Sequence, residues 1–145
     1  MNEYRLEDIS TGMRECFSRK ITRVMEDAFR MISGDDNPLH KDDEYAREIS
    51  TGKYARHVSF GMLTASLFST FAGMYLPGKY SLIHSFEELA FMNPVFAGDE
   101  LTVEGEVTDK DEFLKMIRVK IEIRNQNGKK VARAKMKIIV IYAKH

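Results

Sequence analysis

The chain has 145 residues, and its 22 Lys and Arg balance 22 Asp and Glu, so the formal net charge is zero. This length suffices for one domain with a substantial core, and the charge balance argues against a nucleic-acid-binding protein, which usually carries a basic surface. The only cysteine, Cys16, excludes an internal disulfide, fits a reducing compartment and is expected to be a structural thiol rather than a nucleophile.

The sequence gives no indication of export or membrane insertion. Residues 1–14 carry too many charges for a secretory signal. The longest uncharged run, residues 60–78, is interrupted by Gly, Ser, Thr and Pro, whereas a spanning helix needs about 20 predominantly apolar residues. We therefore expect a soluble, cytoplasmic protein that does not cross a membrane.

The first predicted element is a helix over residues 21–32. Its apolar residues recur at helical spacing and are expected to form one stripe facing the core, namely Ile21, Val24, Met25, Ala28, Phe29 and Ile32. Gly34 should end this helix because glycine tolerates the left-handed conformation found there. The turn-forming residues 35–38 follow, and a second, short helix is predicted over residues 42–48.

Residues 62–76 form a different kind of segment. They are long enough for four helical turns, contain no charge and are apolar on most faces, so the predicted helix must be enclosed by other structure. Burial of each Met, Leu or Phe stabilises by about 1.5–3 kcal/mol, which places this helix at the centre of the core. Its hydroxyl residues are the exception that needs a reason: Thr64, Ser66, Ser69 and Thr70.

From Ser81 onward the apolar period changes to two. Apolar residues occupy odd positions in residues 101–107 and 117–123, and even positions in residues 132–140, after the hairpin signal Asn127-Gly128. This pattern is typical of antiparallel strands with one buried and one wet face. A long apolar helix followed by such strands predicts an α+β fold in which a sheet curls around the helix.

Three short motifs go further than the pattern. They are SGDDNPLH at residues 33–40, FGMLTASLFS at residues 60–69 and FMNPVFAGD at residues 91–99. In order and at nearly the same spacing they resemble motifs of the (R)-specific enoyl-CoA hydratases, the MaoC-like branch of the hot-dog superfamily. The resemblance implies a single hot-dog domain over residues 10–142, with about five antiparallel strands wrapped around the long buried helix.

The resemblance also implies roles for particular residues. Asp35 and His40 would be the catalytic pair that shares one water across the Asn37-Pro38 turn, and Gly61 would donate its backbone N–H to the thioester carbonyl. Ser69 would line the pocket, with Ser66 as second choice. Asn37 and Ala72 complete the expected substrate-binding set. Ala72 is included because it lies one turn from Ser69 on the same helix face, where its small side chain would leave room for acyl chains longer than four carbons.

These residue types suit the implied chemistry. Hydration of an enoyl thioester needs an acid and a base close together and a donor at the carbonyl oxygen, where negative charge gathers. An aspartate is ionised and a histidine mostly neutral near neutral pH, so both can accept from one water. Which of the two returns the proton to carbon stays open. A helix N-terminus at Gly61 offers unpaired N–H groups and a positive dipole end.

By the same resemblance the substrate is a trans-2-enoyl thioester, on coenzyme A in preference to acyl carrier protein, and the product an (R)-3-hydroxyacyl thioester. No bound cofactor or metal is implied, and two domains are expected to pair edge to edge as a homodimer. Lys53, Arg56 and Lys79 are candidates by position for the nucleotide end of coenzyme A.

One departure and two alternatives accompany this interpretation. Phe60 stands where the family commonly has a histidine, which affects the hydrogen bonding expected around the helix start. A hot-dog thioesterase and a non-catalytic acyl-CoA-binding domain are the alternatives, and the intact Asp35 and His40 favour the hydratase. His57, His84 and His145 are expected to be surface histidines.

Overall fold

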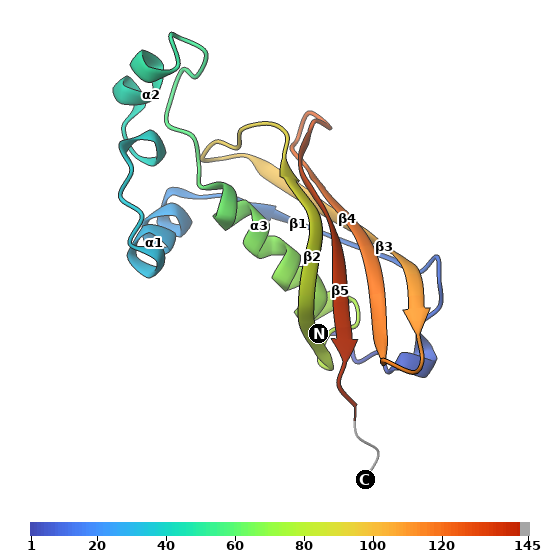
Figure 1. Ribbon diagram of the computed structural model, residues 1–145. Helices are drawn as coiled ribbons and strands as arrows, with labels where there is room; N and C mark the ends of the chain where they lie inside the picture. Colours follow the sequence, from blue (N-terminus) through green and yellow to red (C-terminus); the bar gives the residue numbers. More distant parts are fainter. Residues whose placement is uncertain (143–145) are drawn as a thin grey trace.

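The computed structural model describes residues 1–142 (Figure 1), so the expectation for His145 lies outside the described residues. The elements in chain order are η1 (Leu6–Asp8), β1 (Arg14–Lys20), α1 (Arg23–Ser33), η2 (Pro38–His40), α2 (Asp43–Ile49), α3 (Gly61–Thr70), η3 (Phe71–Tyr75), β2 (Ser81–Phe91), β3 (Glu100–Asp111), β4 (Met116–Arg124) and β5 (Lys130–Val140). Within residues 1–142, every helix is too short or too polar to cross a membrane.

The five strands form one antiparallel sheet in the order β1-β3-β4-β5-β2. The period-two pattern places its apolar residues on the face that α3 covers, and the paired residues Val107, Val119 and Met136 are all fully buried. Gly128 closes the predicted hairpin with φ 73°, a conformation that glycine adopts without strain. The expected hot-dog arrangement is therefore confirmed.

Helix α3 and the η3 segment that continues it pack against the sheet through large aromatic side chains, and one glycine of the sheet makes room for them. Phe68 and Phe71 are fully buried. A Cβ atom at Gly105 on β3 would lie only 2.5 Å from Cζ of Phe71, so the missing side chain at Gly105 provides the space for this ring.

The opposite side of α3 is open. Met62 is 57% exposed, and Ser66, Ser69 and Met74 are also exposed. The five strands therefore cover one side of this helix, and the other side is open in the single chain.

The overhang, defined here as residues 21–60, lies outside the body formed by α3 and the sheet, and carries α1 and α2 (Figure 1). The side chain of Thr22 begins α1 by accepting from the Met25 N–H, and Gly34 ends it in the left-handed conformation as predicted.

The prediction that all the apolar residues of α1 form one stripe facing the core is only partly confirmed. Ile21, Met25 and Phe29 pack inward, but Val24 and Ile32 are 77% and 83% exposed. The short helix predicted over residues 42–48 is confirmed by α2.

Candidate active site

His40 is held at the end of η2 by its own ring. The Asn37 side chain caps this short helix by accepting from the Leu39 N–H at 3.0 Å. Nδ1 of His40 then lies 2.8 Å from the carbonyl oxygen of Val58. Because a carbonyl oxygen only accepts hydrogen bonds, Nδ1 carries the proton and Nε2 of a neutral ring is left with its lone pair. The loop therefore presents a histidine prepared to accept a proton at Nε2.

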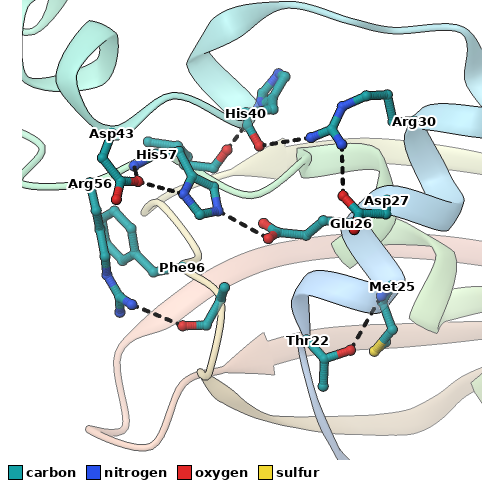
Figure 2. Close-up of polar contacts among 12 residues, drawn as sticks. Thr22, Met25, Glu26, Asp27, Arg30, His40, Asp43, Arg56, His57 and Phe96 are labelled. Atoms are coloured by element: carbon teal, nitrogen blue, oxygen red, sulfur yellow. Dashed lines mark hydrogen bonds and ion pairs between the residues drawn. The ribbon is translucent and has the colours of Figure 1, made fainter.

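Phe60 packs against the ring of His40. The two ring centroids lie 4.3 Å apart, tilted by 34°, and Phe29 of α1 contacts the same phenyl ring at 4.9 Å. Arg30 of α1 also reaches this loop, donating to the His40 carbonyl oxygen at 3.3 Å while pairing with Asp27 at 2.8 Å (Figure 2). An aromatic cluster of Phe29, Phe60 and His40 therefore lies next to the start of α3.

A cavity of about 270 Å³ lies between the end of η2 and the start of α3, and its lining includes His40, Tyr54, Gly61 and Phe91. Gly61 is the first residue of α3, so its N–H has no acceptor within the helix and lies at the positive end of the dipole. A Cβ atom at Gly61 would lie 3.3 Å from Cε1 of Phe91. The predicted oxyanion donor and one member of the predicted catalytic pair therefore share one cavity.

Two hydroxyl groups in the cavity lining were not predicted as site residues. Ser59 and Thr64 are both buried, and neither Oγ atom has a hydrogen-bond partner among the described residues. A buried hydroxyl without a partner costs about 1–3 kcal/mol, so these groups are candidates to bond a ligand in the cavity. The charge-free character of α3 had marked Thr64 as unusual, but no sequence pattern marked Ser59.

The remaining predicted site residues lie outside this cavity lining. Asp35 is exposed on the same loop as His40, and its Oδ1 accepts from the Asn37 N–H at 3.1 Å. Within residues 1–142 no hydrogen bond joins Asp35 to His40. Ser69 is exposed and Ala72 fully buried in the core. The two side chains therefore have different surroundings in the single chain, which does not bring Ser69 and Ala72 to one pocket face.

His57 is the residue that sequence reasoning misplaced most. It was expected at the surface, yet it is only 3% exposed. Its Nδ1 lies 2.7 Å from Oδ1 of Asp43 on α2, and its Nε2 lies 3.0 Å from Oε1 of Glu26 on α1 (Figure 2). The backbone N–H of His57 and then its ring donate to Asp43 and hold the pKa of that carboxyl below its usual value. His84, in contrast, is exposed as expected.

The positions suggested for a nucleotide separate into two groups. Lys53 and Arg56 flank Tyr54, which lines the cavity, and Arg56 donates to the Ala97 carbonyl oxygen at 3.0 Å. Lys79 instead pairs with Glu3 at 3.0 Å, beyond the other end of α3 and η3. These two helical segments together have 15 residues, so Lys79 lies roughly 20 Å from the cavity.

Comparisons with known proteins agree with this architecture. A family model described as a MaoC-like domain matches residues 8–129. The (R)-specific enoyl-CoA hydratase of Aeromonas caviae is 38% identical over 84% of this chain and 88% of its own length. The 3-hydroxybutyryl-CoA dehydratase of Methylorubrum extorquens is 33% identical over 71% of this chain and 63% of its own length.

Among solved structures, the (R)-hydratase from A. caviae involved in PHA biosynthesis superimposes with a TM-score of 0.85 at 33% identity, covering 93% of this chain and 99% of that one. The R-hydratase PhaJ1 from Pseudomonas aeruginosa also gives a TM-score of 0.85, at 27% identity, and covers 97% of this chain and 92% of that one. The family match, the 38% identity and the shared fold together establish that the chain belongs to the MaoC-like dehydratase family.

Proposed function

We propose that this chain is an (R)-specific enoyl-CoA hydratase, which reversibly adds water to a trans-2-enoyl thioester to give the (R)-3-hydroxyacyl thioester. The observation that carries the proposal is the shared cavity of His40 and Gly61, where a proton acceptor and a helix-start N–H face the same space. The names of the relatives, hydratases and dehydratases of acyl-CoA thioesters, support the same reaction.

The reaction divides its tasks between an acid–base pair and a donor to the thioester oxygen. The water oxygen forms a bond to the β-carbon as its proton passes to the base, and the electrons of the double bond move onto the thioester oxygen. Nε2 of His40, together with Asp35, serves as the acid and base, an effect usually worth about 10²–10⁴ in kcat. A proton then reaches the α-carbon and the enolate collapses. The Gly61 N–H stabilises the enolate oxygen, and one such donor is commonly worth about 10²–10³.

A homodimer forms part of this proposal, and the two edges of the sheet support it differently. Edge strand β1 carries charged residues along most of its length. Edge strand β2 and the open side of α3 instead expose large apolar side chains: Met62, Met74, Leu82, Phe86 and Phe91. An exposed apolar edge normally needs a cover. We expect two copies to pair along β2, which would also cover Ser69 and bring further groups over the cavity.

The assembly can be tested with a matched pair of exposed leucines. Leu82 on β2 is 53% exposed, and Leu114 in the β3–β4 turn is 56% exposed. Leu82→Lys should shift the sedimentation mass from dimer towards monomer, whereas Leu114→Lys should not. A monomeric native chain at assay concentration would contradict the dimer.

The activity is tested with crotonyl-CoA as substrate. Hydration removes the ultraviolet absorbance of the conjugated double bond, and chiral chromatography of the product should give the (R) isomer. Release of free thiol would indicate the thioesterase alternative. Crotonyl-CoA binding without turnover would indicate a non-catalytic acyl-CoA-binding domain.

The finer substrate assignments stay predictions. For the nucleotide end of coenzyme A we favour Lys53 and Arg56, which lie beside the cavity-lining Tyr54, over the remote Lys79. Coenzyme A rather than acyl carrier protein as carrier, the lack of a bound cofactor or metal, and a cytoplasmic location are likewise predictions. The assignment of Lys53 and Arg56 is tested by comparing crotonyl-CoA with crotonyl-pantetheine as substrates. Lys53→Ala and Arg56→Ala should raise KM only for the coenzyme A substrate.

A further inference from the structure

We infer that the cluster of Asp43 with the buried Glu26 and His57 positions His40 for catalysis, acting through the carbonyl group of Val58. The cluster joins three parts of the overhang: Glu26 lies on α1, Asp43 begins α2, and His57 lies in the segment that leads into α3 (Figure 2). Only the kinetic consequence of this inference rests on the proposed function; the structural consequence can be measured without any substrate.

The contacts within the cluster determine where its protons lie. Oδ1 of Asp43 accepts from both the backbone N–H of His57 at 2.8 Å and its ring Nδ1 at 2.7 Å. Nε2 of His57 faces Oε1 of Glu26 at 3.0 Å, and these two atoms need one proton between them. The three groups therefore carry one negative charge in total, which Asp43 can hold because its side chain is 42% exposed. Loss of that shared proton would leave two acceptors facing each other.

The cost of this arrangement indicates a role beyond packing. Glu26 is 2% exposed, and its Oε2 has no hydrogen-bond partner among the described residues. Replacing a buried charged cluster with apolar side chains is often neutral or stabilising, so such a cluster is weak evidence for stability. What it does provide is a fixed geometry, because each of its hydrogen bonds is directional.

The cluster is linked to His40 through Val58, the residue that follows His57. The N–H of Val58 donates to the Leu39 carbonyl oxygen at 3.0 Å, and the Val58 carbonyl oxygen accepts from His40 Nδ1 at 2.8 Å. The neighbouring Ser59 N–H donates to the Val95 carbonyl oxygen at 2.7 Å. The contacts of His57 thus fix one end of the short segment whose carbonyl group selects the tautomer of His40. If His57 is released, that carbonyl group and the ring bonded to it can move.

The kinetic test compares two variants that break the hydrogen bonds of the cluster with one variant that keeps them. His57→Ala and Glu26→Ala should each lower kcat about 10- to 100-fold with a smaller change in KM, the usual effect of a misplaced reacting group. Glu26→Gln should stay within about threefold of the native kcat, because its amide can donate to a neutral Nε2 of His57. Val107→Ala, a buried truncation in β3, is the control for lost stability. Assays are run where circular dichroism shows every variant folded.

A second readout is independent of activity. Nitrogen-15 labelling of the four histidines, recorded at a pH where the His40 ring is neutral, reports which of its nitrogens carries the proton. The native chain should show His40 protonated at Nδ1, Glu26→Gln should keep this state, and His57→Ala and Glu26→Ala should show a mixture. If the tautomer changes as expected but the native chain does not hydrate crotonyl-CoA, the proposed function fails and the positioning role stands.

The inference is overturned if His57→Ala and Glu26→Ala keep both the His40 tautomer and the native kcat. It is also overturned if Val107→Ala lowers kcat as much as they do. Should His57→Ala fail to fold, the comparison of Glu26→Ala with Glu26→Gln decides, with Val107→Ala as the control for the volume that Glu26→Ala removes; only Glu26→Gln keeps a group that can bond His57.

Discussion

The imidazole of His40 and the backbone of Val58 are joined by a 2.8 Å hydrogen bond although they lie 18 positions apart in the chain. This contact selects Nε2 as the nitrogen left free. It also links the loop before α2 to the segment before α3, so the reactive ring and the first N–H of α3 are held by neighbouring backbone. An asparagine at position 40 could keep the bond to Val58 through its amide, but it would offer no basic nitrogen to a substrate.

His40→Asn and Asp35→Asn should therefore each lower kcat by about 10²–10⁴, with His40→Asn close to native thermal stability. The double variant should lose little more, because residues that act as a unit are not additive. Asp36→Asn removes an exposed carboxylate paired with Lys41 and is the active control. Near-native steady-state rates in either single variant would refute that residue's role.

Thr64→Val exchanges a buried hydroxyl, which has no hydrogen-bond partner within residues 1–142, for a methyl group of the same shape. Removing the unmet hydrogen-bonding group should stabilise the free protein by up to about 1 kcal/mol, which corresponds to a Tm rise of about 2–4 °C. The same change should raise KM about 2- to 10-fold if the hydroxyl bonds the substrate. Ser66→Ala, which removes an exposed hydroxyl bonded to the Leu63 carbonyl oxygen at 2.6 Å, should change neither. A lower Tm for Thr64→Val would mean that the hydroxyl already has a partner.

Ala72→Leu should affect stability and not acyl-chain preference. Ala72 is fully buried in the core, and added methylene groups in a packed core cost about 1–3 kcal/mol. Thermal unfolding should show a lower Tm, while the ratio of kcat/KM for six- and four-carbon enoyl-CoA substrates should stay constant. A Cβ atom added at the neighbouring Gly73 would meet no atom within 4 Å, so Gly73→Ala is the tolerated control. A loss of kcat/KM for the six-carbon substrate alone would instead indicate that Ala72 lines the acyl site.

Asp43→Asn should change the pH dependence of stability. Hydrogen bonds from His57 lower the pKa of Asp43 below its ordinary value of 3.8. A carboxyl group whose pKa is lowered in the folded state stabilises the fold at pH values above its ordinary pKa. That stability is lost as the pH falls through the folded-state pKa. The Tm difference between the native chain and Asp43→Asn should therefore be greatest near neutral pH and shrink below about pH 4. Glu44→Gln removes a neighbouring exposed charge from α2 and serves as the control, and parallel Tm curves for the native chain and Asp43→Asn would contradict the effect.

The fold was predictable where the sequence pattern is local. Alternation along β3, β4 and β5 depends only on which residues face the helix, and these burial patterns are confirmed. The stripe on α1 failed in part because helical spacing shows that residues share a face but not whether the chain covers that face. Val24 and Ile32 have the expected spacing and remain exposed.

The site was predictable only through its motifs. The loop motif singled out His40, and the start of the central-helix motif singled out Gly61; the structure brings these two to one cavity. The burial of His57 depends on carboxylates 31 and 14 residues away in the chain. No local pattern marks such a contact, because neither Glu26 nor Asp43 differs from an ordinary helix carboxylate until the overhang folds. Asp35 shares the motif with His40, and its pairing with that ring stays a prediction.

The overhang carries a consequence for how the protein loses activity on heating. His40 and its supporting residues belong to this outlying segment (Figure 1), while the largest fully buried side chains lie mainly in α3, η3 and the sheet. Segments with little apolar burial open before the core does. Amide exchange in α1 and α2 should accordingly be faster than in β4, and proteases should cleave first within residues 35–56. Warming would then inactivate the chain reversibly while its sheet is still intact.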